Sequence, residues 1–110
     1  MIDKNKIYYM LGLRMFYDEQ GWEQPNYEKD FQIPMTEELS KNIDETIEFL
    51  EELNANNFIL VIEILDELIE KTQSHKLICA IKRIGKEKNI DEKWLNHEIE
   101  LSSQMLQHKI

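Results

Sequence analysis

The sequence is poor in the residues that break or redirect a chain. Its 110 residues include only three glycines and two prolines. Because both residue types are concentrated in turns, their scarcity favours few turns and long helices. The chain is rich in Ile and Leu, which argues against disorder, since these residues supply a core. A chain of this length is expected to form a single domain that comprises residues 1–110.

Cysteine is almost absent. Cys79 is the only one, which excludes an internal disulfide. Its neighbours Leu77, Ile78 and Ala80 are apolar. We therefore expect Cys79 to be a small core residue.

Long apolar runs are missing too. The longest, residues 58–62, is far shorter than a membrane-spanning helix requires. Residues 1–6 are mixed in character and are not followed by the apolar stretch and cleavage site of a secretory signal. The expectation is a cytoplasmic protein that has no membrane partner.

The sequence also lacks the residue patterns that support catalysis or metal binding. His75, His97 and His108 show neither the His-x-x-x-His spacing of helical zinc sites nor the Glu-x-x-His spacing of di-iron sites. The isolated glycines form neither a nucleophile elbow nor a phosphate-binding loop, and there is no calcium-binding loop. We therefore expect no enzymatic activity, no cofactor and no metal.

The apolar residues recur with the period of an α-helix, which predicts an all-α fold: a small bundle of four to five amphipathic helices. The first helix is apolar around most of its circumference, so we expect it to be buried or packed on two sides. The expected helices are residues 4–19; a helix from Thr36, its N-cap, to residue 53; residues 58–72; a helix from Ser74 to residue 84, which Gly85 would end; and a last helix capped by Asp91.

One connection is unusually long and aromatic. Residues 21–35 hold both prolines together with Trp22, Tyr27 and Phe31. Loops of this length are either functional or packed by their own side chains. The aromatics therefore either fold back onto the core or contribute to a binding surface, where aromatic residues are enriched.

Negative charge is concentrated in the middle of the sequence. The whole chain has a net charge of −9, whereas residues 36–70 alone hold eleven acids and one base, a net charge of −10. Residues 71–93 hold seven bases and three acids, a net charge of +4. Phosphate groups repel an acidic protein, so we expect no nucleic-acid partner. A basic protein partner fits the charge.

The acids also follow helical spacing. Residues 63, 66, 67 and 70 share one helix face, and residues 44, 48, 51 and 52 share another. Like charges at these spacings destabilise an isolated helix by about 0.2–0.5 kcal/mol per pair. The stripes are either ordinary solvated faces or, if the two helices form a hairpin, one acidic docking surface. The predicted partner-binding residues are Glu48, Glu51, Glu52, Glu63, Asp66, Glu67, Glu70, Trp22 and Tyr27.

These features resemble the helical immunity proteins of bacterial contact-dependent growth-inhibition systems. The resemblance is one of overall character, and it rests on the acidic segments 47–53 and 62–68 and on the connection that carries Trp22, Tyr27 and Phe31. It implies a monomer that binds a basic toxin nuclease, an RNase in preference to a DNase, and covers its active cleft. The alternative is a helical adaptor or regulatory subunit of a larger assembly, which could be homo-oligomeric.

Overall fold

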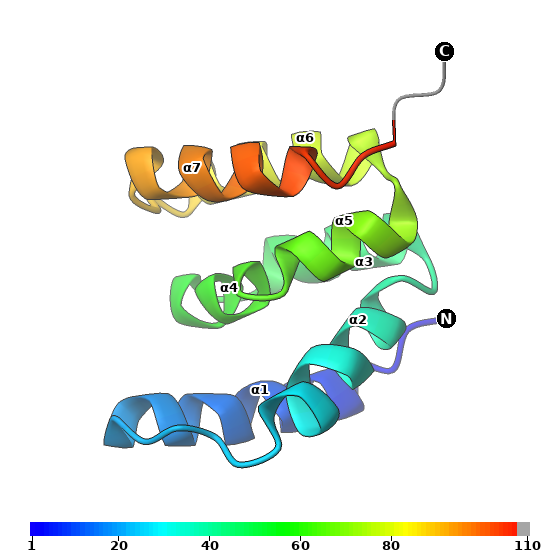
Figure 1. Cartoon of the computed structure of the whole chain (residues 1–110). Coiled ribbons are helices and arrows are strands. Elements are labelled where there is room, and N and C mark those ends of the chain that lie inside the picture. Colours follow the sequence, from blue (N-terminus) through cyan, green and yellow to red (C-terminus); the bar gives the residue numbers. More distant parts are fainter. Residues whose placement is uncertain (108–110) are drawn as a thin grey trace.

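The computed structural model describes residues 1–107, all of whose regular structure is helical (Figure 1). The prediction of an all-α fold is confirmed, but this part of the chain has seven α-helices and not four to five. The elements are α1 (Lys4–Gln20), the π-helix η1 (Glu28–Gln32), α2 (Ile33–Leu39), α3 (Ile43–Glu52), α4 (Ala55–Ile62), α5 (Leu65–Thr72), α6 (His75–Glu87) and α7 (Glu92–Ser103).

The helices form three groups. In Figure 1, α6 and α7 lie at one end of the molecule, α3, α4 and α5 lie in the middle, and α1 and α2 lie at the other end. The middle group bridges the two ends, because α3 packs on α6, α5 packs on both α7 and α2, and α4 packs on α1. Phe31, Phe49 and Phe58 are fully buried in this core. No helix within residues 1–107 has the length and apolarity to cross a bilayer.

The additional helices arise where two expected helices are broken. Thr36 is not an N-cap: it lies inside α2, and its hydroxyl donates to the Gln32 carbonyl at 2.7 Å. Asn42 caps α3 instead, because its side-chain oxygen accepts the Glu45 N–H at 3.0 Å. The second break falls between α4 and α5, where Ile64 leaves helical geometry and is fully buried. A continuous helix would spread the apolar residues from 60 to 65 around its circumference, and the break allows them to be buried together.

The long connection is shorter than the sequence predicts. Irregular backbone is confined to residues 21–26, since helical backbone starts at Tyr27 and η1 and α2 begin before Thr36. Pro34 is the second residue of α2, directly after η1, and its missing N–H interrupts the backbone hydrogen bonds where the π-helix changes to an α-helix. The connection between α1 and η1 starts at Gly21, whose φ of 71° suits a glycine at the end of a helix.

The first helix packs on one side only, so the prediction of two-sided packing is wrong. α1 runs unbroken through Gly12 and buries Ile7, Met10 and Leu11. Tyr9 and Phe16 point outward instead. An unpartnered aromatic face therefore remains on α1.

Two expectations for α6 are also wrong, although Ser74 and Asp91 cap their helices as predicted. The helix passes Gly85 and ends at Glu87. Gly85 is needed there for packing, because a Cβ at this position would lie 2.1 Å from Cδ2 of Leu95. Cys79 is exposed and not a core residue, since it lies on the face of α6 opposite to the buried Leu77 and Ile81.

Candidate functional site: an acidic seam between α2 and α5

The acidic stripe of α3 faces cations on neighbouring helices. Glu51 lies 3.7 Å from Arg83 of α6, and Glu52 lies 2.8 Å from Lys4 of α1. Asp44 pairs with Lys76 of α6, and Glu48 is exposed. Exposed ion pairs of this kind contribute little stability. They do reduce the negative charge on this side of the molecule.

The acidic stripe around α5 is divided between two neighbours. Asp66 accepts a hydrogen bond from the hydroxyl of Ser102 in α7 at 2.8 Å. Glu63 and Glu67 face the other way. Glu63 lines a hollow with residues of α1 and of the connection, and Glu67 lines a hollow with residues of η1 and α2. Glu70 is exposed. The two predicted stripes therefore contact different surroundings.

The two hollows form what we call the acidic seam. Tyr27 of the first hollow and Glu28 of the second are consecutive in the chain, and Glu63 of the first and Glu67 of the second lie on either side of the helix break at Ile64. The first hollow, of about 510 Å³, is lined by Arg14, Glu23, Gln24, Tyr27 and Glu63. The second, of about 230 Å³, is lined by Glu28, Gln32, Ile33, Thr36, Glu37, Glu67 and Lys71.

The acidic seam carries an excess of negative charge. Its lining includes five carboxylates and two cations, a net charge of −3. One of the cations, Arg14, is already neutralised by Glu63, to which its Nε and Nη2 donate at 3.0 and 3.1 Å. Ile33, which is 48% exposed, adds an apolar surface. The seam thus combines negative charge with an accessible apolar group.

Tyr27 lies at the centre of the first hollow. Its ring packs against Phe31, with the ring centroids 5.5 Å apart, and the guanidinium carbon of Arg14 lies 5.4 Å from its centroid. Burial and the nearby charge of Glu63 raise the pKa of Tyr27 to about 12. The phenol is therefore neutral near pH 7 and can donate a hydrogen bond.

Gln24 has a buried acceptor without a donor. The residue is 8% exposed, and its side-chain oxygen Oε1 has no hydrogen-bond partner within residues 1–107. Such a group costs about 1–3 kcal/mol of stability, so its presence calls for an explanation. A donor brought by a partner to the first hollow would supply the missing bond.

The aromatics of the connection have three different environments. Phe31 is buried in the core and Tyr27 is half-buried. Trp22 is 58% exposed and packs edge-on against Phe16, with the ring centroids 6.1 Å apart. Phe31 therefore folds back onto the core, which was one of the two expected alternatives, whereas Trp22 stays exposed.

Of the nine predicted site residues, the structure brings three into the acidic seam, namely Tyr27, Glu63 and Glu67. Sequence reasoning missed Glu23, Glu28 and Glu37, because it considered acids only where they formed stripes on one helix. One signal could have identified these acids: they lie close in sequence to Tyr27, which was already a predicted site residue. The opposite wall, about 40 residues later, could not be read from spacing.

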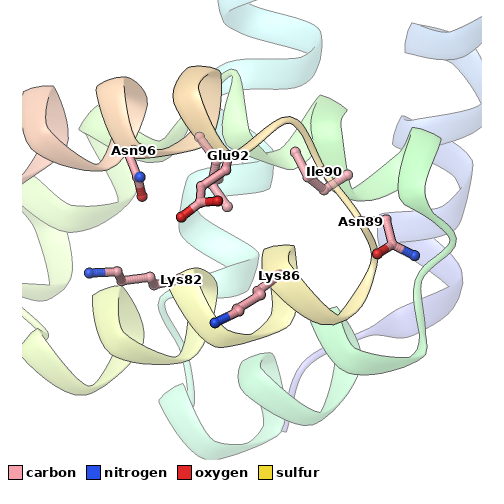
Figure 2. A pocket seen from close by; sticks show the side chains of 7 residues that line it. Lys82, Lys86, Asn89, Ile90, Glu92 and Asn96 are labelled. Atoms are coloured by element: carbon pink, nitrogen blue, oxygen red, sulfur yellow. The ribbon is translucent and has the colours of Figure 1, made fainter.

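A hollow separate from the acidic seam lies between α6 and α7 and is lined by charges of both signs. It has a volume of about 330 Å³, and Figure 2 shows Lys82 and Lys86 on α6 below Glu92 and Asn96 on α7. The carboxylate of Glu92 offsets part of the lysine charge. Its two lysines and one glutamate give a net charge of +1, which is smaller in magnitude than the −3 of the acidic seam.

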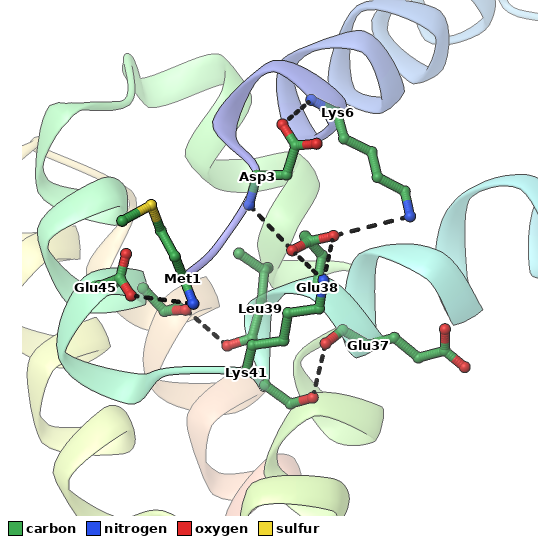
Figure 3. Close-up of polar contacts among 10 residues, drawn as sticks. Met1, Asp3, Lys6, Glu37, Glu38, Leu39, Lys41 and Glu45 are labelled. Atoms are coloured by element: carbon green, nitrogen blue, oxygen red, sulfur yellow. Dashed lines mark hydrogen bonds and ion pairs between the residues drawn. The ribbon is translucent and has the colours of Figure 1, made fainter.

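A buried carboxylate outside the acidic seam attaches α1 to α2 (Figure 3). Glu38, only 2% exposed, accepts hydrogen bonds from the Asp3 backbone N–H at 3.0 Å and from Lys41 Nζ at 3.1 Å, and Lys6 lies 3.8 Å away. Burial alone would raise the pKa of Glu38, but these donors and cations outweigh it and lower that pKa. Glu38 is thus a structural anion that holds the start of the chain in place.

Comparison with known proteins gives no family assignment. Neither a protein-family model, nor a curated protein, nor a solved structure matches this chain. Within residues 1–107, no three Cys, His, Asp or Glu side chains are grouped so that they could hold a metal ion. Function has to be inferred from the geometry and charge of the chain itself.

Proposed function

We propose that this chain is a binding protein that docks a basic protein partner in its acidic seam. The observation that carries the proposal is the seam itself, whose two hollows are lined by five carboxylates and carry a net charge of −3. Complementary charge speeds the encounter of two proteins and selects the correct partner. Ile33 and Tyr27 supply the apolar contact that surrounds the charges.

The partner we propose is a toxin nuclease, with an RNase favoured over a DNase. A nuclease cleft is basic because it holds phosphate groups. The carboxylates of the acidic seam would lie where substrate phosphates otherwise bind, so the complex would exclude the substrate. This proposal agrees with the resemblance to immunity proteins and places the chain in the cytoplasm, where such a toxin acts.

The test compares two variants with equal changes in net charge. Glu28→Lys/Glu67→Lys alters the acidic seam, whereas Glu48→Lys/Glu100→Lys alters exposed acids of α3 and α7. Each tagged protein is used to recover binding partners from the native lysate at low and moderate salt, and a recovered basic protein is assayed for RNase and DNase activity with and without the chain.

We expect wild type and the α3/α7 variant to capture and inhibit the same nuclease. The seam variant should associate at least ~10-fold more slowly. Equal binding by the seam variant, or loss of binding only in the α3/α7 variant, would exclude the seam as the docking site. If the captured partner has no nuclease activity, the proposal of a binding protein stands and the proposal of toxin neutralisation is rejected.

The structure also favours a second candidate function, that of a helical adaptor or regulatory subunit. The specific observation is the unpartnered aromatic face of α1, where Tyr9 is 73% exposed and Phe16 is 48% exposed. A monomeric inhibitor that docks through the acidic seam does not need this face. A subunit of an assembly does.

A further inference from the structure

The outer face of α1, which we define as Tyr9, Gly12, Leu13 and Phe16, presents aromatic side chains around a glycine. Tyr9 and Phe16 are seven residues apart, which places them on the same side of the helix two turns from each other. Trp22 extends this face, because its ring packs on Phe16. A group of exposed aromatic side chains on one surface is typical of an interaction site.

Nothing inside the molecule explains Gly12. It lies in the middle of a continuous helix, where glycine is unfavourable relative to alanine. A Cβ built at this position meets no atom within 4 Å, and the backbone there is ordinary right-handed helix. The remaining structural use of a glycine here is to let another backbone approach α1 closely from outside.

The position of Gly12 makes the outer face self-complementary. α1 spans residues 4–20, so Gly12 is its midpoint. If a second copy packs antiparallel about this point, Tyr9 of one copy lies opposite Phe16 of the partner subunit, and the reverse contact is equivalent. A twofold interface requires this relation, in which the same patch serves both subunits.

The charges of α1 favour the same arrangement. Lys4 and Lys6 lie at the start of the helix, and Asp18 and Glu19 lie near its end. Antiparallel packing brings ends of opposite charge together, whereas parallel packing brings like charges together. Lys4 and Lys6 also pair with Glu52 and Glu38 of their own chain, which reduces this contribution. With three bases and two acids, α1 has a net charge of +1, so two chains of net charge −9 repel each other less here than elsewhere.

We infer that two copies of this chain pair through the outer face of α1 as an antiparallel dimer whose twofold axis passes near Gly12. The acidic seam stays open on both copies, because Arg14 faces the seam and Phe16, two residues later, points to the opposite side of α1. This dimer differs from the monomer that the resemblance to immunity proteins implies. The dimer does not depend on the proposed function.

The first experiment measures mass by light scattering over micromolar to millimolar concentrations. We expect wild type to reach the dimer mass. Gly12→Gln should raise the melting temperature, because glutamine favours helix, while weakening dimerisation at least ~10-fold by blocking the close approach. Leu101→Gln, a polar substitution at an exposed apolar residue of α7, should leave the dimer unchanged.

A second experiment tests the direction of packing by mild oxidation in a Cys79→Ser background. Gly12→Cys should form a disulfide-linked dimer, because both copies meet at this position and the covalent bond traps the pair even though the added side chain weakens reversible dimerisation. Asn5→Cys should not link to itself, but it should link to a Gln20→Cys chain when the two are mixed. Both positions are exposed near opposite ends of α1.

Three results would overturn the inference: a monomer mass throughout the concentration range, a dimer unaffected by Gly12→Gln, or self-linking of Asn5→Cys. Capture of a basic partner by the Gly12→Gln variant tests the acidic seam separately. Loss of the dimer with retained capture supports both proposals. A stable dimer without capture would reject the proposed function alone.

Discussion

Arg14 of α1 binds Glu63, at the junction of α4 and α5, through two parallel hydrogen bonds that connect residues 49 positions apart. The Arg14 side chain is largely shielded from water, whereas Glu63 is more exposed, and the Arg14 guanidinium also stacks on Tyr27. Paired, charge-assisted bonds of this geometry are stronger than single ones. The pair lines the acidic seam and links α1 to the junction of α4 and α5.

Replacing Arg14 should therefore weaken the fold more than replacing an exposed arginine. We expect Arg14→Gln to lower the free energy of unfolding by about 1–2 kcal/mol, because Glu63 loses its donors and Tyr27 loses its stacked cation. Arg83→Gln removes pairs with Glu51 and Glu87 that are more exposed and should cost less than about 0.5 kcal/mol. Urea titration of both variants measures the difference, and equal losses would show that the Arg14 pair has no special weight.

Gln24 should reduce stability and support binding. Gln24→Met keeps the length of the side chain and removes the unpartnered acceptor, so we expect a gain of about 1 kcal/mol in the free energy of unfolding. The same change should weaken capture of the partner if a partner donor reaches Oε1. Gln104→Met, at an exposed residue, serves as the control for both measurements. A destabilised Gln24→Met variant would mean that the amide makes a favourable contact in solution.

The three glycines should respond differently to alanine. Gly12→Ala should raise the free energy of unfolding by about 1 kcal/mol, because the new Cβ meets open space in a helix. Gly21→Ala should lower it by about 1–2 kcal/mol because of its left-handed backbone. Gly85→Ala should lower it by about 1–3 kcal/mol, because Leu95 must move. Thermal and denaturant unfolding measure the relative stabilities of the three variants. A destabilised Gly12→Ala variant would contradict the open environment of that residue.

The carboxylate of Glu38 should make stability depend on acidity. Its pKa is lower in the folded chain than the ordinary value of 4.5, so its contribution is complete above that value and is lost as the pH falls through the folded-state pKa. We expect the free energy of unfolding to decrease below about pH 4.5 and Glu38→Gln to reduce this decrease. Glu37→Gln, the exposed neighbour, should leave the acid profile unchanged. Parallel acid profiles of wild type and Glu38→Gln would show that Lys41 and the Asp3 N–H do not favour the ionised form.

The sequence predicted the helical content, because periodic apolar residues and the local caps at Ser74 and Asp91 act within one turn. It did not predict the breaks. Thr36 and Asn42 are both good capping residues, and only packing decides between them. The break at Ile64 likewise follows from burial against other helices, which no local propensity encodes.

The acidic seam and the outer face of α1 were hidden for a related reason. The seam needs residues 23–37 to lie against residues 63–71, and spacing along one helix says nothing about that proximity. The sequence predicts that Gly85 ends its helix and that Gly12 lies inside one, but it does not indicate what either glycine packs against. The structure separates them, because one faces Leu95 and the other faces no atom of its own chain.

The two walls of the acidic seam come from segments that are made at different times during synthesis. A nascent chain that has produced Tyr27 and Glu28 has no seam until residues 63–71 emerge and close against them. A partner that recognises the seam would therefore ignore unfinished or unfolded copies and bind only completed ones. Its binding would in turn shift the population toward the folded chain by mass action, so the abundance of the partner would set how much of the protein survives.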